Sequence, residues 1–381
     1  MSFFRCPTEV IYGFNSVKRL GEVLADLKVM KVLLVTDKGV RAAGILDVVA
    51  DQIKGAGISF EVFEEVEPNP SVETVEKAFG VFMESKCEAI VAVGGGSPLD
   101  VGKAVGILGA NGGSILEYEG VEKAKNVSAP VIAIPTTAGT GSEVTIYLVI
   151  TDQKRSYKFT IVSKKAAAKV AILDPMLTTS MPPSLTASTG MDALVHAIES
   201  YTSLMSNPIS EALAIKAIQL ISANLRPAVF NGRDLTARDA MLMGSLLAGM
   251  AFNNTRLGNA HAMSHPVSAY FGVPHGVANA ILIPYVMEFN LPAVPQKFKE
   301  IARAMGCNVD GLSAMGAAKA AVVAIWELLE DLGLPKKLSE VGVKEEAVSA
   351  MADDAMKSGN VLVNPRTTTR EDILKIYRQA L

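Results

Sequence analysis

The four histidines of this 381-residue chain lie in two short stretches. His196 follows Asp192 by four residues in GMDALVHAIES, and the stretch HAMSHPVSAYFGVPH holds His261, His265 and His275. Residues four apart share one face of a helix. One carboxylate with several imidazoles suits a divalent transition metal such as Fe²⁺ or Zn²⁺. Each histidine alone is more often a core or surface group, but the constellation predicts a catalytic metal with an open coordination position.

The cysteines exclude one kind of metal site and indicate a cellular compartment. Cys6, Cys87 and Cys307 are far apart, and none of them has metal-ligand spacing with another. A structural zinc site with thiolate ligands is therefore excluded. Three distant cysteines also argue against a disulfide framework, and they favour the reducing cytoplasm.

Length and composition indicate a globular protein of two domains. A chain of 381 residues exceeds the usual size of one domain, and its 49% hydrophobic and 20% charged residues fit a large core. The net charge of −3 gives no reason to expect nucleic acid. We find no apolar run near the roughly 18–20 residues that span a bilayer, and MSFFRCPTEV does not resemble a signal peptide. We expect no membrane partner.

The first half of the chain alternates between strand and helix patterns. The strand patterns are KVLLVTD (31–37), SFEVFEEV (59–66), AIVAVGGGS (89–97) and PVIAIPTTAGTGSE (130–143). The helix patterns between them are GILDVVADQIKGAG (44–57), VETVEKAFGVFMES (72–85) and PLDVGKAVGILGA (98–110). Single helices between strands predict a mostly parallel sheet. EVTIYLVITD (143–152) and SYKFTIVS (156–163) indicate a further strand pair around a polar turn.

The second half is helical. Amphipathic patterns follow Pro183, among them 210–225, 237–252, 314–333 and 370–381. SMPPS has the composition of a hinge. We therefore predict an α/β dinucleotide-binding domain over residues 1–182 and an all-α metal-binding and catalytic domain over residues 183–381.

The segment AIVAVGGGSPLDVGKA has the features of a phosphate site. Three glycines after a buried strand let the backbone approach a ligand closely, and the following helix offers free N–H groups to a pyrophosphate. We expect Ser97 to cap this helix, with Pro98 at its first position and Asp100 completing a capping box. The alternative is an ordinary strand-to-helix turn, because GGGS is not the full dinucleotide fingerprint.

Two further features fall where a dinucleotide would bind. TTAGTGSE (136–143) supplies hydroxyls and glycines after another strand of the same predicted sheet. Asp37 closes the first strand pattern, where a carboxylate can accept hydrogen bonds from an adenosine ribose. Alternatively, Asp37 only begins the next helix.

Over essentially its whole length the chain resembles the iron-containing (group III) alcohol dehydrogenases. The matching motifs are TDKG, VEPNPS, VAVGGGSPLDVGKA, IPTTAGTGSEVT, DPMLTTSMPPSLTASTGMDALVHAIESY, LAGMAFNNTRLGNAHAMSHPVSAYFGVPHGVANAILIPYV and NPRTTTREDILKIYRQAL. The resemblance implies the fold of that family and of dehydroquinate synthase. It also implies NAD(P)-linked interconversion of an alcohol and an aldehyde.

The resemblance also implies roles for particular residues. The metal ligands would be Asp192, His196, His261 and His275. His265 would stay off the metal and act near the nicotinamide. The cofactor contacts would be Asp37, Asn69, Gly95, Gly96, Ser97, Thr136, Thr137, Ser142, Tyr147, Lys158 and Leu177.

We therefore expect a cytoplasmic oxidoreductase that uses Fe²⁺, with Zn²⁺ as an alternative metal, and NAD in preference to NADP. Its substrate would be a small primary alcohol or diol and the corresponding aldehyde, and its assembly a homodimer or larger homo-oligomer. Two other functions stay open at this point. One is an NAD- and metal-dependent lyase or cyclase similar to dehydroquinate synthase, and the other is a metal- and nucleotide-binding protein without turnover.

Overall fold

The chain divides into two compact units in the computed structural model, which describes residues 3–155 and 157–381. One unit comprises Cys6–Met181, and the other comprises residues 3–5 together with Pro182–Leu381. The division falls within the proline-containing SMPPS stretch. Ser156, at which one predicted strand begins, lies outside the described residues.

A six-stranded parallel sheet forms the centre of the Cys6–Met181 unit, in the order β1-β9-β6-β4-β2-β3. Its strands are β1 (Glu9–Tyr12), β2 (Lys31–Val35), β3 (Ser59–Phe63), β4 (Ala89–Gly94), β6 (Val131–Pro135) and β9 (Val170–Leu173). This sheet confirms the predicted fold class. The predictions missed β1 and β9, since apolar runs of four residues give little periodic signal.

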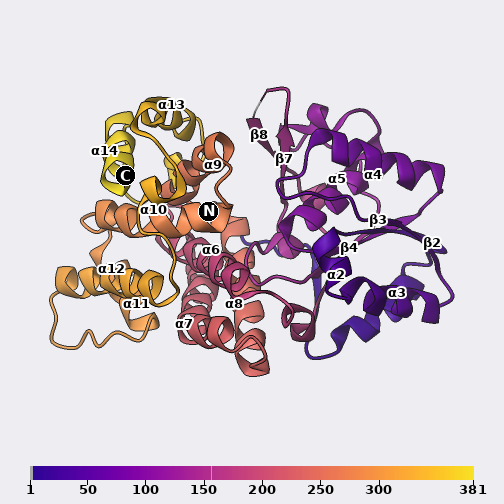
Figure 1. The fold of residues 1–381 in the computed structure, drawn as a ribbon, viewed down its shortest axis with the longest axis horizontal. Helices are drawn as coiled ribbons and strands as arrows, with labels where there is room; N and C mark the ends of the chain where they lie inside the picture. The colour runs from indigo at the N-terminus through magenta and orange to yellow at the C-terminus, as the bar shows by residue number, and fades with distance from the viewer. Residues whose placement is uncertain (1–2, 156) are drawn as a thin grey trace. The chain divides into compact units, whose positions relative to one another are not determined.

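Helices cover both faces of this sheet (Figure 1). They are α1 (Leu20–Asp26), α2 (Lys38–Ala42), α3 (Ile45–Gly55), α4 (Val72–Glu84) and α5 (Gly96–Asn111). Successive β2 residues alternate between two apolar cores, because neighbouring side chains of a strand point to opposite faces. Leu33 packs in the core with α4 and α5, whereas Leu34 packs in the core with α1 and α3.

A smaller sheet contains β5 (Gly120–Val121), β7 (Tyr147–Asp152) and β8 (Tyr157–Val162). Strands β7 and β8 are antiparallel, which confirms the predicted strand pair. The first of the two begins later than predicted, because residues Ser142–Val144 form a short 3-10 turn.

The second unit is helical, and the part of it that the structure describes contains no strand. Its helices are α6 (Pro183–Thr202), α7 (Pro208–Phe230), α8 (Leu235–Thr255), α9 (Asn259–Phe271), α10 (His275–Asn290), α11 (Pro295–Ala304), α12 (Ala314–Asp331), α13 (Glu345–Ala355) and α14 (Arg370–Ala380). Helix α6 packs against α7, α8 and α10. It is therefore the central element of this unit, and it carries Asp192 and His196.

Helix α14 supports α9 from the far end of the chain. Pro266 lies inside α9 and has no N–H to donate, so it disturbs the hydrogen bonding of the turn before it. The hydroxyl of the buried Tyr377 on α14 donates to the carbonyl of Met263 in this turn, at 2.6 Å. The C-terminal segment thus holds the helix that carries His261 and His265.

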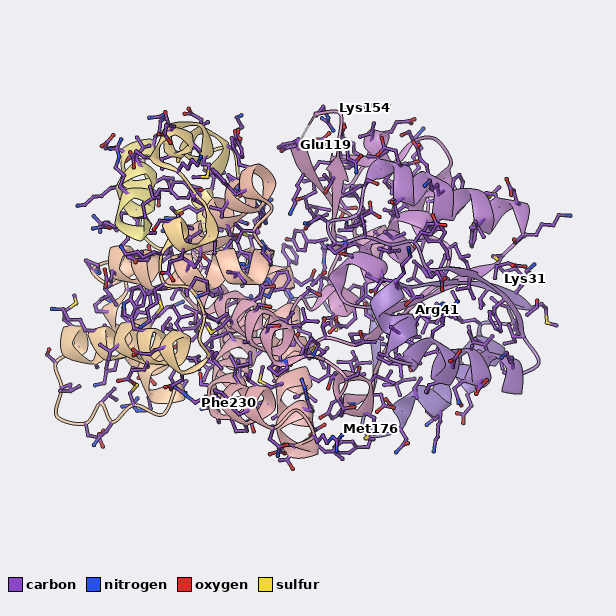
Figure 2. The ribbon with its side chains drawn as sticks, viewed as in Figure 1. Lys31, Arg41, Glu119, Lys154, Met176 and Phe230 are labelled. Carbon is purple, nitrogen blue, oxygen red and sulfur yellow. The ribbon has the colours of Figure 1, made fainter. Side chains whose placement is uncertain are left out.

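Charged side chains on the Cys6–Met181 unit include Lys31, Glu119 and Lys154 (Figure 2). Phe230 is one of several exposed apolar side chains, with 71% of its surface exposed. Within residues 3–155 and 157–381, we find no helix that combines the length and the apolar character needed to cross a bilayer.

Candidate metal centre and dinucleotide site

Three of the four predicted metal ligands converge in the helical unit. Candidate ligand atoms of Asp192, His261 and His275 all lie within 4.8 Å of one another. Asp192 Oδ1 is 3.6 Å from His261 Nε2 and 3.9 Å from His275 Nε2. Asp192 and His261 are buried, whereas 30% of the His275 side chain is exposed to solvent. One side of the cluster therefore stays accessible.

His196 and His265 flank this group. His196 Nε2 lies 3.9 Å from Asp192 Oδ1, and its ring stacks between Phe252 and His261 with centroid distances of 4.5 and 4.6 Å. The His265 ring is 5.2 Å from the His275 ring and 6.4 Å from the His261 ring. All four histidines thus meet at one place.

Local packing explains why these helices bring their ligands together. Pro274 fixes the turn before α10, as predicted, so that His275 is the first helical residue. Gly276 follows, and a Cβ built there would lie 2.2 Å from the carbonyl oxygen of Ser188 on α6. Only glycine lets α10 approach α6 so closely, and this approach sets His275 beside Asp192.

The cluster fits a cation. The amide nitrogen of the buried Asn279 lies 2.7 Å from Asp192 Oδ1, 3.0 Å from His261 Nε2 and 3.1 Å from His275 Nε2. One positively polarised N–H₂ group is thus surrounded by three potential ligand atoms. Asn279 Oδ1 is buried and has no hydrogen-bond partner among the described residues. A carboxylate with imidazole nitrogens is also a donor set that Fe²⁺ and Zn²⁺ accept.

The electrostatics of the cluster favour positive charge. Burial raises the pKa of Asp192, but the surrounding histidines outweigh it and hold that pKa well below its usual range. Burial lowers the pKa of His261, yet the neighbouring carboxylates of Asp192 and Glu199 raise it to about 9. A divalent ion would therefore compete with a proton for this site.

Glu199 and Asn279 were missed in the sequence, although the helical period could have found them. Glu199 follows Asp192 by seven residues and His196 by three, on the same face of α6. Asn279 follows His275 by four residues on α10. The carboxylate of Glu199 contacts His261 Nδ1 at 2.6 Å.

In the α/β unit, the two predicted phosphate loops contact each other. The Thr136 N–H donates to the carbonyl of Gly94 at 2.9 Å. A Cβ built on Gly95 would lie 3.4 Å from Thr137, and one built on Gly96 would lie 2.9 Å from Thr140. The loops after β4 and β6 are therefore adjacent at the carboxyl ends of neighbouring strands, where open α/β sheets bind ligands.

The predicted cap of α5 is wrong. The helix begins at Gly96 with Gly95 as its cap and no side-chain capping bond, so Ser97 lies inside it. Gly94 has φ of 148°, and the helix begins two residues earlier than we expected. The Asp100 carboxylate instead accepts from Ser142 Oγ at 2.6 Å and from the Val149 N–H at 2.9 Å. The result is a bare helix N-terminus, which leaves N–H groups free for an anion.

Asp37 begins helix α2, which is one of the two alternatives considered for it. Strand β2 ends at Val35, and Asp37 caps α2 by accepting from the Val40 N–H through Oδ1 at 2.9 Å. Its other oxygen, Oδ2, lies 3.3 Å from the Cβ position of Gly94. Asp37 is therefore a helix cap whose second oxygen faces the glycine loop.

The remaining predicted cofactor residues fall into different surroundings. Lys158 Nζ on β8 donates to Asn69 Oδ1 at 2.8 Å, and burial lowers the pKa of Lys158 to about 8. The Tyr147 carbonyl accepts from the buried Lys103, which also pairs with Asp100. Leu177 is 6% exposed and packs in the core beneath the sheet, so its contact surface for a ligand is small.

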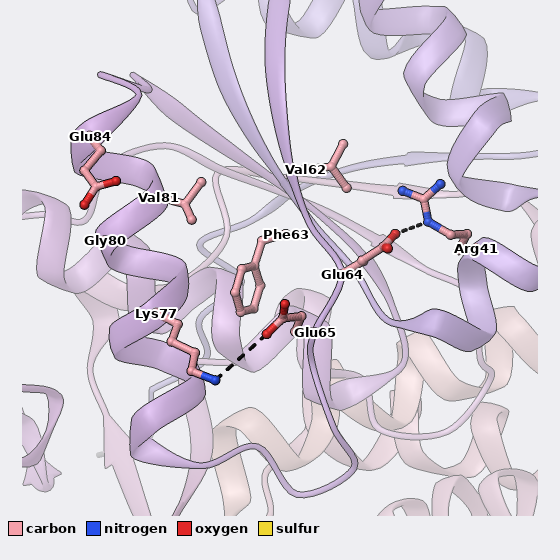
Figure 3. Close-up of a pocket in the computed structure, with 9 residues that line it drawn as sticks. All are labelled: Arg41, Val62, Phe63, Glu64, Glu65, Lys77, Gly80, Val81 and Glu84. Carbon is pink, nitrogen blue, oxygen red and sulfur yellow. Dashed lines mark hydrogen bonds and ion pairs between the residues drawn. The ribbon is translucent and has the colours of Figure 1, made fainter.

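A separate cavity of about 610 Å³ opens at the β3 edge of the sheet (Figure 3). Its lining includes the ion pairs Arg41–Glu64 and Lys77–Glu65. None of the predicted cofactor residues is among those that line it. This cavity is therefore not the dinucleotide site that the sequence indicates.

Comparisons with known proteins agree with this geometry. Residues 7–175 match the model of the iron-containing alcohol dehydrogenase family, and residues 186–381 match the model of the C-terminal region of the Fe-containing alcohol dehydrogenase family. The 1,3-propanediol dehydrogenase of Citrobacter freundii is 47% identical over 376 residues, which is 98% of this chain and 97% of that protein. The NAD-dependent methanol dehydrogenase of Bacillus methanolicus is 41% identical over 380 residues, covering 100% of both chains.

A solved structure of an alcohol dehydrogenase from Oenococcus oeni superimposes with a TM-score of 0.98, at 41% identity and with 100% of both chains covered. The fold and these matches define the class of protein as a metal-dependent alcohol dehydrogenase. The chain belongs to the iron-containing alcohol dehydrogenase family. The protein is therefore an oxidoreductase, with iron and a nicotinamide dinucleotide as the cofactors of its class, and the lyase alternative is not supported.

Proposed function

We propose that the enzyme interconverts a short primary alcohol or diol and its aldehyde, with NAD as the hydride acceptor. The observation that carries this proposal is the convergence of Asp192, His261 and His275 in one cluster. The named relatives act on 1,3-propanediol and methanol, which are small hydroxyl compounds.

Asp192, His196, His261 and His275 would hold the metal. When bound, the divalent ion supplies Lewis acidity toward the alcohol oxygen, and the nicotinamide accepts the hydride. Asp192 supplies negative charge to the site, and the stacked His196 and His261 rings fix the orientation of two imidazoles. The exposed side of His275 leaves the cluster open to a small molecule.

The α/β unit would bind NAD through its two adjacent loops. The free N–H groups at the start of α5 suit a pyrophosphate, and Asp37 Oδ2 is oriented toward the same loop for the ribose hydroxyls. Lys158 adds a cation close to Asn69.

The closing test is an NADH-coupled panel of short aldehydes, diols and hydroxy acids with the Fe²⁺-loaded enzyme. Steady NADH formation from a diol or a primary alcohol would support the proposal. Binding of metal and NAD without turnover across the panel would contradict it.

His265→Ala should keep the bound metal and lower the rate. The His265 ring lies beside His275, but the four proposed ligands already leave only one open position for the substrate. Metal content is measured after anaerobic reconstitution, together with kcat. Loss of metal in proportion to activity would show that His265 is a ligand.

NAD should be preferred over NADP because of Asp37. A carboxylate repels a 2′-phosphate by about 3 kcal/mol per unit of phosphate charge at ~5 Å and an effective dielectric near ~20, or roughly two decades in affinity. Screening and the adjacent Lys38 will reduce this effect. The measurement is kcat/KM for both cofactors in the wild type and in Asp37→Gly. In the variant, kcat/KM should rise with NADP and fall modestly with NAD.

Asp37→Asn is the matched variant, because asparagine keeps the cap on α2 and removes only the charge. It should shift the cofactor ratio in the same direction as Asp37→Gly. An unchanged ratio in both variants would leave Asp37 as a helix cap alone.

We further propose a homo-oligomer in the reducing cytoplasm. The three cysteines are free, which fits that compartment. Leu204 and Leu362 are 66% and 78% exposed, and the Leu204 N–H donates to the Val363 carbonyl at 2.9 Å, so the two segments are adjacent. An apolar patch formed there would favour an interface. Light scattering coupled to size exclusion would give the subunit number.

A further inference from the structure

We propose that Glu199 is a positioning residue for the metal, acting through His261. It holds the ring so that Nδ1 carries the proton and Nε2 presents a lone pair to the ion. This inference rests on the proposed metal centre, and it adds a residue that does not itself ligate.

The contacts of Glu199 are short and buried. Its Oε2 lies 2.6 Å from His261 Nδ1, with 4% of the Glu199 side chain and 1% of the His261 side chain exposed. Its Oε1 accepts the backbone N–H of Ala260 at 2.7 Å, in the first turn of α9. Each oxygen thus has its own donor, and the backbone bond fixes the carboxylate relative to α9.

A neutral histidine carries one ring proton, and the partner of one nitrogen decides which nitrogen keeps it. Glu199 accepts at Nδ1, so the proton stays there and Nε2 is left for the ion. Carboxylate–histidine–metal arrangements of this kind orient the ring and raise the basicity of the ligand. His261 Nε2 is the nitrogen that lies near Asp192 and His275.

The surrounding chain leaves room for this carboxylate. A Cβ built on Gly258 would lie 2.9 Å from Glu199 Oε1 and 3.2 Å from Asn364 Oδ1. Asn364 Oδ1 also accepts a hydrogen bond from the Asn259 backbone N–H. The side-chain amides of Asn364 and Asn290 on α10 each donate to the other. The closing NPRTTT segment therefore ties the start of α9 to α10 at the place where Glu199 enters.

Stability alone does not account for a carboxylate at this position. Within the described part of the chain, His261 is the one ion-pair partner that Glu199 has. Burying a charged pair costs several kcal/mol per ion, and apolar residues of similar size are often equally or more stabilising. The site keeps the pair because the ring has to be oriented.

Glu199→Gln tests this directly, since it keeps the size and turns one acceptor into a donor. If its amide N–H₂ faces His261, the ring proton moves to Nε2 and the lone pair for the metal is lost. If the amide N–H₂ faces Ala260 instead, it meets the Ala260 backbone N–H, and two donors then face each other in a buried site. Either orientation should weaken metal binding by about 10–100-fold, the range for outer-shell partners.

The experiment uses full-length, metal-stripped protein titrated with Zn²⁺ against a competing chelator, and with Co²⁺ for its visible spectrum. The variants are Glu199→Gln and Glu199→Leu. Both remove the buried charge, and the leucine also removes the polar group, so it keeps the proposal testable if Glu199→Gln fails to fold. Glu211→Gln is the matched control, because Glu211 is a partly buried carboxylate of the same unit whose partners are Lys297 and Ser206.

We expect weaker Zn²⁺ binding and an altered Co²⁺ spectrum in both Glu199 variants, with Glu211→Gln matching the wild type. Wild-type affinity and spectrum in a folded Glu199 variant would overturn the role of Glu199. A wild-type protein that binds neither ion would instead overturn the metal centre itself, so the two failures are distinguishable.

Discussion

Replacing His261 with alanine should remove the metal from the enzyme and abolish turnover with it. His261 is 1% exposed, and its Nε2 lies 3.6 Å from Asp192 Oδ1 at the centre of the ligand cluster. The substitution removes one ligand and leaves Glu199 Oε2 buried without its partner at Nδ1. The lost ligand weakens metal binding directly. The unpaired carboxylate weakens the site as well, because an uncompensated buried charge is strongly destabilising.

We expect metal affinity to fall by more than the roughly 10–100-fold that follows the loss of a residue that only supports a ligand. The measurement is bound iron per chain after anaerobic reconstitution, with kcat on the same samples. Near-UV circular dichroism and NAD binding serve as controls for folding. Wild-type iron content together with wild-type turnover would reject His261 as a ligand.

Gly276→Ala should disrupt the metal centre although it replaces none of the proposed ligands. The new Cβ would lie 2.2 Å from the carbonyl oxygen and 2.8 Å from the carbonyl carbon of Ser188, and neither backbone atom can move aside as a flexible side chain would. Helix α10 must therefore shift away from α6 and carry His275 away from Asp192. Overpacking of this kind costs about 1–3 kcal/mol.

Gly80→Ala is the control for Gly276→Ala. Gly80 is also helical, in α4, but a Cβ there meets nothing within 4 Å. That substitution should be neutral or stabilise by up to ~1 kcal/mol, since glycine is unfavourable inside a helix. The readouts are thermal unfolding and the Zn²⁺ dissociation constant. Unchanged metal affinity in Gly276→Ala would show that the contact between α6 and α10 does not set the ligand geometry.

The sequence predicted those parts of the site that follow from local spacing. The i, i+4 pairs Asp192–His196 and His261–His265 lie on α6 and α9, and Pro274 directly precedes the helix that begins at His275. Glu199 lies three residues after His196 and seven after Asp192 on α6, so the helical period could have predicted it. The assignment of the four ligands stays a prediction until metal is measured.

Long-range contacts could not be predicted in this way. Tyr377 reaches Met263 from 114 residues away, and Asn364 reaches Asn259 from 105. No local pattern encodes such pairs, because they depend on how the helices pack. The cap of α5 was predicted wrongly for a different reason. Ser97 and Pro98 are good starting residues for a helix, but the preceding glycines turn the chain sooner.

The most direct test of the central claim is the fate of deuterium from 1,1,3,3-tetradeuterated 1,3-propanediol. The wild-type enzyme is stripped of metal, reconstituted with Fe²⁺ under anaerobic conditions and given this substrate with NAD. The account predicts that NADH accumulates in proportion to the aldehyde formed, that each NADH carries one deuterium, and that the metal-stripped enzyme forms none. NADH formed equally without metal, or a product formed with no net NADH, would contradict a metal-dependent alcohol dehydrogenase.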